Sequence, residues 1–177
     1  MIDHEKKIIQ NIKNGNQQAF KKLYDAYANY ALRTTFAITR NNNYVTDIVQ
    51  ETFIRVYRSI DKFNLKQPFK PWFYRILLNE SIRYMKKQKK EPTCIEPGQL
   101  NNYMINKQTE NESHDHLAQA LDHLSETHRT VLVLKYMNEF TEKEIANLLN
   151  LNINTVKSRL YKARQKLKKA LGEINNE

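Results

Sequence analysis

The sequence predicts an all-α protein made of two small helical domains that a flexible linker joins. Only three Gly and four Pro occur among its 177 residues, and runs with the alternating apolar pattern of strands are missing. Apolar residues instead recur every three or four positions in several segments, as they do in amphipathic helices. A content of 40% hydrophobic residues is enough to build a core for each of two such domains.

Charge and composition indicate where the domains end. Residues 1–90 carry 18 basic and 7 acidic side chains, whereas residues 91–117 carry 1 basic and 5 acidic ones. This second segment is rich in Asn, Glu and Ser, contains two Pro, and has no helical apolar period. We therefore predict a first domain at residues 1–90, a flexible linker at residues 91–117 and a second domain at residues 118–177.

The first strongly patterned helix is predicted at residues 45–60. One face of it is apolar and is formed by Val45, Ile48, Val49, Thr52, Phe53, Val56 and Ile60. The opposite face is polar except for Ile54, which lies at its centre. A single exposed Ile is common on protein surfaces, but an apolar centre with a charged rim is also typical of a protein-binding face.

An aromatic and basic segment comes next. Five of the twelve residues from Phe63 to Tyr74 are aromatic, and Pro71 can occupy the first position of the helix that follows. One side of this helix is basic and polar, with Arg75, Ile76, Asn79, Arg83 and Lys86, and Trp72 stands at its start. Aromatic rings beside cations and amides are what single-stranded DNA requires, although core packing remains the alternative for each aromatic taken alone.

The second domain contains a predicted helix-turn-helix. Thr141 and Glu144 have the spacing of a capping box, and the helix that they begin stops at Asn150, a residue that tolerates the left-handed conformation. Asn152 can cap a second helix only two residues later. Two helices joined by about three residues are typical of the DNA-binding motif.

The second helix of this motif has an apolar stripe and a basic face. The stripe consists of Val156, Leu160, Ala163, Leu167 and Leu171. The stretch from Asn154 to Lys169 carries seven Lys or Arg residues and no acidic residue. This pattern suits the major groove of DNA, with polar groups for base edges and cations for phosphates; an ordinary amphipathic helix with a solvated basic face is the alternative.

The whole chain has 29 basic and 19 acidic residues and a pI near 9.6, which favours a polyanionic partner. We expect no metal and no cofactor, because His114, His116 and Cys94 lack the spacing of a zinc site. No catalytic signature occurs, so we expect neither an enzyme nor a small-molecule substrate. A single Cys, no apolar window of membrane-spanning length and no signal peptide lead us to expect a cytoplasmic protein.

Three segments resemble a bacterial sigma factor of the extracytoplasmic function family, within the larger sigma-70 family. Regions 2.1–2.2 of that family are matched by the segment DIVQETFIRVYRSIDKF, and regions 2.3–2.4 by FKPWFYRILLNESIRYMKK. Region 4 is similar to the segment LSETHRTVLVLKYMNEFTEKEIANLLNLNINTVKSRLYKARQKLKKAL. The resemblance implies a region 2 domain and a region 4 domain in two all-α units, with RNA polymerase core and promoter DNA as partners.

The resemblance also implies roles for particular residues. A face that would dock on the β′ clamp helices of polymerase comprises Asp47, Gln50, Glu51, Ile54, Arg55 and Arg58. Residues that would contact the minus-10 element are Phe63, Asn64, Phe69, Lys70, Trp72, Arg75, Asn79, Arg83 and Lys86. Residues that would contact the minus-35 element are Asn154, Thr155, Lys157, Ser158, Arg159, Tyr161, Lys162 and Arg164.

In this family the β flap of polymerase is a further contact, and an anti-sigma factor is the expected regulator. Lys157 and Lys162 stand where several relatives have Arg, so the preferred minus-35 bases stay open. Two other classes of protein compete with the sigma factor as interpretations of this sequence. A two-component regulator with a helix-turn-helix would carry an α/β receiver domain, and a small nuclease would carry clustered carboxylates for metal; neither pattern occurs in this sequence.

Overall fold

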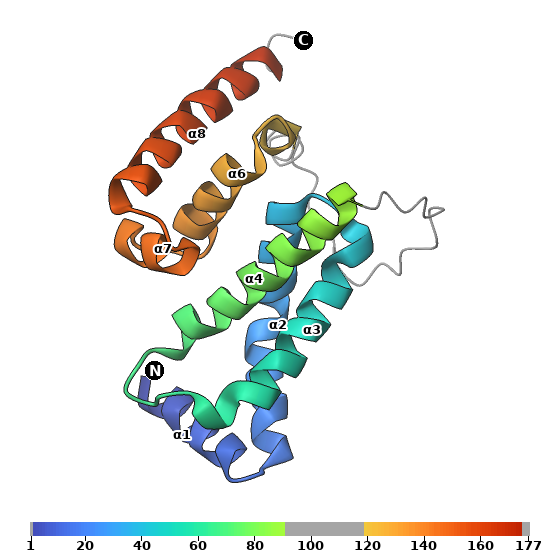
Figure 1. Ribbon diagram of the computed structural model, residues 1–177, viewed down its shortest axis with the longest axis vertical. Coiled ribbons are helices and arrows are strands. Elements are labelled where there is room, and N and C mark those ends of the chain that lie inside the picture. Colours follow the sequence, from blue (N-terminus) through green and yellow to red (C-terminus); the bar gives the residue numbers. More distant parts are fainter. Residues whose placement is uncertain (1, 91–118, 175–177) are drawn as a thin grey trace. The chain divides into compact units, whose positions relative to one another are not determined.

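The computed structural model describes residues 2–90 and 119–174, and every regular element within these two ranges is a helix (Figure 1). The predicted all-α class is therefore confirmed. Contacts divide the chain into two compact units, residues 1–96 and 97–177. The predicted linker at residues 91–117 lies outside the described residues.

The first unit is a bundle of helices. The long helices α2, α3 and α4 pack against one another, and α1 packs on α2 (Figure 1). Short 3-10 turns, η1 at Asn42–Tyr44 and η2 at Ile60–Lys62, precede and follow α3. The bounds of the four α-helices are α1 Ile2–Lys13, α2 Gln17–Thr39, α3 Val45–Ser59 and α4 Phe69–Lys90.

Helix α3 buries the apolar face that its sequence predicts. All seven residues of the predicted stripe are buried, including the polar Thr52 and Ile60, which lies in η2 directly after the end of α3 at Ser59. Thr52 is accommodated because its hydroxyl donates to the carbonyl of Ile48 one turn earlier, at 2.7 Å. The stripe therefore fixes which face of α3 remains available to a partner.

Helix α4 begins earlier than predicted, at Phe69 rather than at Pro71. Phe69 is fully buried, with its ring centroid 5.3 Å from that of Tyr27 and 5.7 Å from that of Phe63. Pro71 still lies in the first turn, where backbone N–H groups have no partner within the helix, so its missing N–H costs no hydrogen bond.

The second unit contains the predicted helix-turn-helix. A helical turn at residues 119–122 comes first. It is followed by α6 Glu126–Leu132, a π-helical turn η3 Val133–Met137, α7 Glu142–Leu149 and α8 Ile153–Ile174. Helix α8 packs against both α6 and α7. The predicted stripe of α8 faces these partners, since Val156, Leu160 and Ala163 are buried.

The predicted caps are present at the start of α7 and at both ends of the turn between α7 and α8. The backbone N–H of Thr141 donates to the Glu144 carboxylate at 2.8 Å, and the Thr141 hydroxyl accepts from the N–H of Glu144 at 3.3 Å. Asn150 adopts a left-handed conformation with φ of 53°. The Asn152 side chain accepts from the N–H of Asn154 at 2.8 Å, at the start of α8. The caps therefore confirm the predicted register of the motif.

The capping box gives a first prediction about stability. Because α7 has only eight residues, loss of its N-cap in Thr141→Ala is expected to lower the stability of the second unit by about 1 kcal/mol. Hydrogen-exchange protection of residues 142–149 measures this effect. Thr141→Ser keeps the accepting hydroxyl and should retain protection. Unchanged protection in Thr141→Ala would contradict the role assigned to the cap.

Candidate functional site

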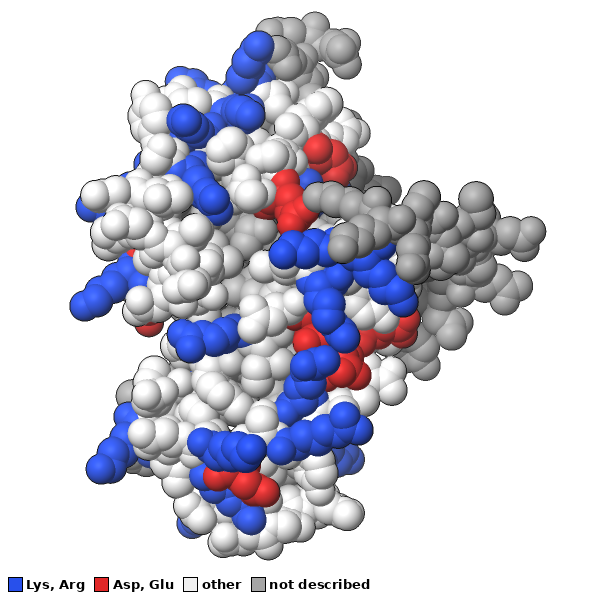
Figure 2. Space-filling view, in the orientation of Figure 1, with Lys and Arg blue, Asp and Glu red and all other residues white. Residues whose placement is uncertain are grey.

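The outward face of α8 is the most basic of the surfaces that the sequence predicts to bind DNA. Lys157, Ser158, Tyr161 and Lys162 are all exposed, and they lie opposite the buried stripe. Of the other predicted minus-35 residues, Asn154 and Arg164 are exposed, whereas Thr155 and Arg159 are half-buried. Over the face of the molecule that Figure 2 shows, Lys and Arg side chains are spread more widely than Asp and Glu.

His128 of α6 lies close to the cations of α8. Burial lowers the pKa of its imidazole, and the neighbouring cations Lys166, Lys162 and Arg159 lower the pKa further. Its Nδ1 lies 2.9 Å from the hydroxyl oxygen of Ser125. A positive field that disfavours another cation favours a phosphate, so it supports an anionic partner for this surface.

The π-helical turn adds Tyr136 to this surface, a residue that was not predicted as functional. Arg164 donates to the hydroxyl of Tyr136 at 3.4 Å, and Tyr136 is exposed. The turn arises where the N–H of Asn138 donates to the carbonyl of Val133, five residues earlier, at 3.1 Å. Because this turn places Tyr136 against α8, it belongs to one flank of the basic face.

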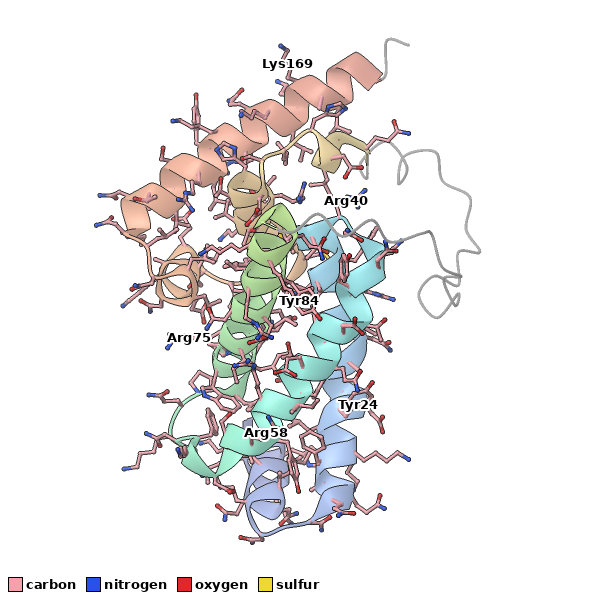
Figure 3. All side chains as sticks on the ribbon, turned by 45° about the vertical axis from the view of Figure 1, so that its right-hand side comes forward. Tyr24, Arg40, Arg58, Arg75, Tyr84 and Lys169 are labelled. Carbon is pink, nitrogen blue, oxygen red and sulfur yellow. The ribbon has the colours of Figure 1, made fainter. Side chains whose placement is uncertain are left out.

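A second polar surface runs along α4. Arg75, Asn79, Arg83 and Lys86 recur every three or four residues and are exposed, and Trp72 at the start of the row is half-buried. Figure 3 shows Arg75 on this helix and Arg58 on α3. The spacing aligns one amide and three cations on a single side of α4, as predicted from the sequence.

Two of the aromatic residues predicted to contact the minus-10 element are instead in the core. Phe63 is 4% exposed and Phe69 is 1% exposed, so neither ring can stack on a DNA base in this structure. Both rings pack against Trp72, with centroid distances of 4.9 and 5.5 Å. The aromatic cluster thus holds together the two ends of the loop between η2 and α4. Of the other loop residues predicted, Asn64 is exposed and Lys70 is half-buried.

The polar face of α3 carries Ile54 as predicted. Its side chain is 36% exposed, and Asp47, Gln50, Arg55 and Arg58 around it are exposed, while Glu51 is half-buried. Tyr57 of α3 and Tyr24 of α2 are also exposed, at 53% and 43%, although the sequence analysis selected neither. The Tyr24 ring packs on Phe53 at 4.7 Å, which fixes it at the surface of the bundle (Figure 3).

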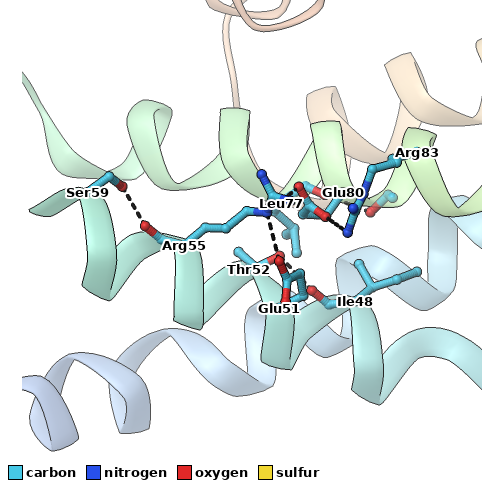
Figure 4. A network of polar contacts seen from close by, with 9 residues as sticks. Ile48, Glu51, Thr52, Arg55, Ser59, Leu77, Glu80 and Arg83 are labelled. Carbon is cyan, nitrogen blue, oxygen red and sulfur yellow. Dashed lines mark hydrogen bonds and ion pairs between the residues drawn. The ribbon is translucent and has the colours of Figure 1, made fainter.

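An ion-pair network connects the faces of α3 and α4. The Glu80 carboxylate is 4% exposed and lies 2.8 Å from Arg55 Nε and 2.5 Å from a terminal nitrogen of Arg83 (Figure 4). Arg55 Nε also contacts Glu51 at 3.0 Å. Glu80 was not predicted as a functional residue, yet it holds one arginine from each predicted surface.

A groove of about 450 Å³ lies beside this network. The residues that line it belong to α3 and α4, namely Glu51, Arg55, Arg58, Ser59, Ile76, Asn79 and Glu80. Three of these were predicted to contact polymerase and one to contact the minus-10 element. The structure therefore brings members of both predicted sets to one groove.

Within the described ranges, residues 2–90 and 119–174, no group of three or more His, Cys, Asp or Glu side chains could hold a metal ion. The candidates Cys94, His114 and His116 lie outside them. Among the helices of the described ranges, none has the length and apolar character to cross a membrane.

Comparison with known proteins assigns both units. The sigma-70 region 2 family matches residues 23–91, and the sigma-70 region 4 family matches residues 114–167. The chain is 30% identical to the extracytoplasmic function sigma factor SigW of Bacillus subtilis, over 96% of this chain and 97% of SigW. It is 31% identical to SigM of the same organism, over 83% of this chain and 91% of SigM.

Solved structures share the fold. The structure of CnrH in complex with the cytosolic domain of CnrY matches with a TM-score of 0.71 and 24% identity, over 96% of this chain and 97% of that one. The sigma factor RpoE of Bartonella quintana, in complex with the anti-sigma factor NepR, matches with a TM-score of 0.68 and 24% identity. This match covers 86% of this chain and 96% of RpoE. The two family matches and the relatives that extend over nearly the whole sequence show that the chain belongs to the extracytoplasmic function family of sigma-70 RNA polymerase sigma factors.

Proposed function

We propose that the chain assigns its tasks in promoter recognition to three separate surfaces. The polar face of α3, centred on Ile54, binds the β′ clamp helices of core polymerase. The loop before α4 and the exposed row on α4 bind the opened minus-10 element. The outward face of α8 binds the minus-35 element as duplex DNA, and the β flap of polymerase contacts this second unit.

The observation that carries the proposal is the face of α8. It is exposed and basic, its apolar stripe is already buried against α6 and α7, and it follows a turn capped on both sides. Such a helix has no structural need for its outward residues, so they are available to base edges and phosphates. The role in this proposal is noncatalytic and cytoplasmic: the chain supplies sequence specificity and strand opening to polymerase.

We also propose that an anti-sigma factor regulates the chain. Two proteins of the same fold, CnrH and the RpoE of Bartonella quintana, have been solved in complex with CnrY and NepR respectively, and NepR is an anti-sigma factor. An inhibitor that covers the face of α3 would compete with core polymerase. Competition for core binding is therefore the behaviour that we expect from it.

The proposal that α8 binds the minus-35 element and α4 the minus-10 element can be tested on a single promoter. The promoter is first selected from random duplex DNA by its binding to core polymerase in complex with this chain. Lys162→Ala is expected to change which minus-35 bases are preferred, at a cost of about 1–3 kcal/mol for a lost base contact. Asn79→Ala is expected to leave duplex minus-35 binding unchanged and to impair opening at minus 10, because only separated strands expose base edges to α4. Duplex binding at several salt concentrations and permanganate footprinting measure the two effects.

Matched controls exist for both variants. Lys168→Ala removes the same charge from an exposed position farther along α8 and should at most lower affinity evenly and flatten its salt dependence. Asn29→Ala removes an exposed amide from α2 and should open promoters normally. The proposal is wrong if Asn79→Ala opens promoters normally while Lys162→Ala abolishes opening without a change in duplex affinity.

A further inference from the structure

Lys13, the last residue of α1, makes two hydrogen bonds to a distant part of the chain. Its ammonium group donates to the backbone carbonyl of Asp61 at 2.9 Å and to that of Phe63 at 2.7 Å. The residues so joined are 48 and 50 positions apart. Both carbonyls lie where η2 ends and the loop to α4 begins (Figure 1). One side chain of α1 thus ties down the entrance to this loop.

The loop itself, residues 64–68, is ordered by its own contacts. The Asn64 side chain accepts from the N–H of Lys66 at 2.9 Å, and its carbonyl accepts from the N–H of Gln67 at the same distance. These bonds close a turn whose residues, apart from the half-buried Leu65, are exposed. The rings of Phe63 and Phe69 meet at 5.7 Å and join the two ends. The loop is therefore an exposed turn held above a buried aromatic base.

Helix α1 is anchored firmly enough to serve as the other end of this tie. Ile9 and Ile12 are buried. Near the start of the helix, Glu5 accepts a hydrogen bond from the hydroxyl of Tyr27. Burial, together with this carboxylate, raises the pKa of the Tyr27 hydroxyl, so that the hydroxyl stays a donor. The Tyr27 ring packs against Phe69 at 5.3 Å, so both ends of α1 connect to the base of the same loop.

Two carbonyls facing one ammonium group make a stiff connection. Hydrogen bonds from a charged donor are shorter and stronger than bonds between neutral groups. The direction of these two hydrogen bonds also matters, because it fixes the orientation of the Asp61 and Phe63 peptide groups. That orientation determines the path on which the chain enters the turn at Asn64. Without Lys13 the aromatic rings would still hold the two ends together, but the peptide planes between them could rotate.

We propose that Lys13 is a positioning residue for minus-10 recognition: it fixes the peptide groups of Asp61 and Phe63 so that the loop at residues 64–68 presents its turn to unpaired promoter bases. The inference rests on the proposed minus-10 role of this loop and α4, and it extends that role to α1, which lies before the residues matched by the region 2 family. Lys13 need not touch DNA, since it acts through the backbone of the loop.

The test compares three variants in complete holoenzyme, assembled from core polymerase and the full chain. Lys13→Met keeps the length of the stem and removes the donors, Lys13→Arg restores donors, and Lys7→Met removes the same charge from an exposed position of α1. The probe is a single strand carrying the selected minus-10 sequence, measured against strands with one base changed. The ratio of these affinities measures discrimination and does not depend on the fraction of active protein.

We expect Lys13→Met to lower this discrimination ratio about tenfold, as the loss of charge-assisted hydrogen bonds permits the turn to move. Lys13→Arg should restore most of the ratio and Lys7→Met should keep it unchanged. A Lys13→Met protein that melts earlier and binds core less well but discriminates normally would overturn the proposal and leave Lys13 a structural tie only. If the unaltered chain shows no minus-10 discrimination while it still selects minus-35 sequences, the proposed function of this loop fails instead.

Discussion

Replacement of Ile54 by Glu is expected to weaken binding of the chain to core RNA polymerase by about 2 kcal/mol or more, which is roughly a thirtyfold rise in Kd. Ile54 is an exposed apolar residue surrounded by charged side chains. At the centre of a docked face, an added carboxylate would lose water without gaining a partner. In the absence of polymerase it stays in solvent, so helix content and melting temperature should remain nearly unchanged.

Ile153 provides a matched control for this variant. It is 38% exposed, against 36% for Ile54, and it lies at the start of α8 in the other unit. Ile153→Glu therefore makes the same chemical change at the same exposure and should keep affinity for core within about twofold. Fluorescence anisotropy of labelled chain titrated with core measures both. If Ile54→Glu unfolds the protein, yet its folded fraction binds core normally, Ile54 belongs to the core of the bundle.

Replacement of Glu80 by Ala is expected to lower the free energy of unfolding of the first unit by about 1.5–3 kcal/mol, the range for hydrogen bonds to charged groups. The buried carboxylate pairs with Arg55 and Arg83 from two helices, and both arginines lose that partner in the variant. The arginine side chains are 44% and 55% exposed, so they remain solvated and the loss stays below that of a fully buried pair.

Chemical denaturation of the full chain measures the effect of Glu80→Ala. Glu51→Ala is the control, because Glu51 contacts the same Arg55 nitrogen from a more exposed position and should cost at most about 0.5 kcal/mol. The double variant Glu80→Ala with Arg55→Ala should lose less than the sum of the two single variants, since both remove one interaction. Additive losses would show that Glu80 and Arg55 stabilise the unit independently.

Local sequence patterns predicted those elements that local chemistry determines. The stripe of α3 has one apolar residue every three or four positions, and burial of that stripe follows from helix geometry alone. The caps at Thr141 and Asn152 depend on side chains within three residues of the backbone groups that they satisfy, and Asn150 ends α7 through its own left-handed backbone. Such signals are complete within a short window, so the structure confirmed them.

Features that depend on a partner from another element were missed, or were left open between two alternatives, by the local sequence. Phe63 and Phe69 stand among basic residues, a pattern that fits both base stacking and core packing, and the choice is made by the ring of Tyr27 on α2. Glu80 follows Asn79 in a polar stretch, so its burial requires an arginine that reaches across from α3.

Two other features leave no periodic signal in the sequence. The π-helical turn at η3 needs only one hydrogen bond displaced by a residue, which leaves no periodic signal in the sequence. The bonds from Lys13 join residues about fifty positions apart, and no local pattern marks them. Local sequence therefore does not predict a feature when contacts between distant residues decide which of two equally suitable roles a side chain takes.

Transcription from a selected promoter by core polymerase supplied with this chain alone tests the central claim most directly. We predict transcripts with a single start site on templates that carry the selected minus-10 and minus-35 elements. Those transcripts should be lost when either element is scrambled and greatly reduced with Ile54→Glu. Transcripts that begin equally well on scrambled templates, or an Ile54→Glu protein that supports full promoter-specific initiation, would contradict the account.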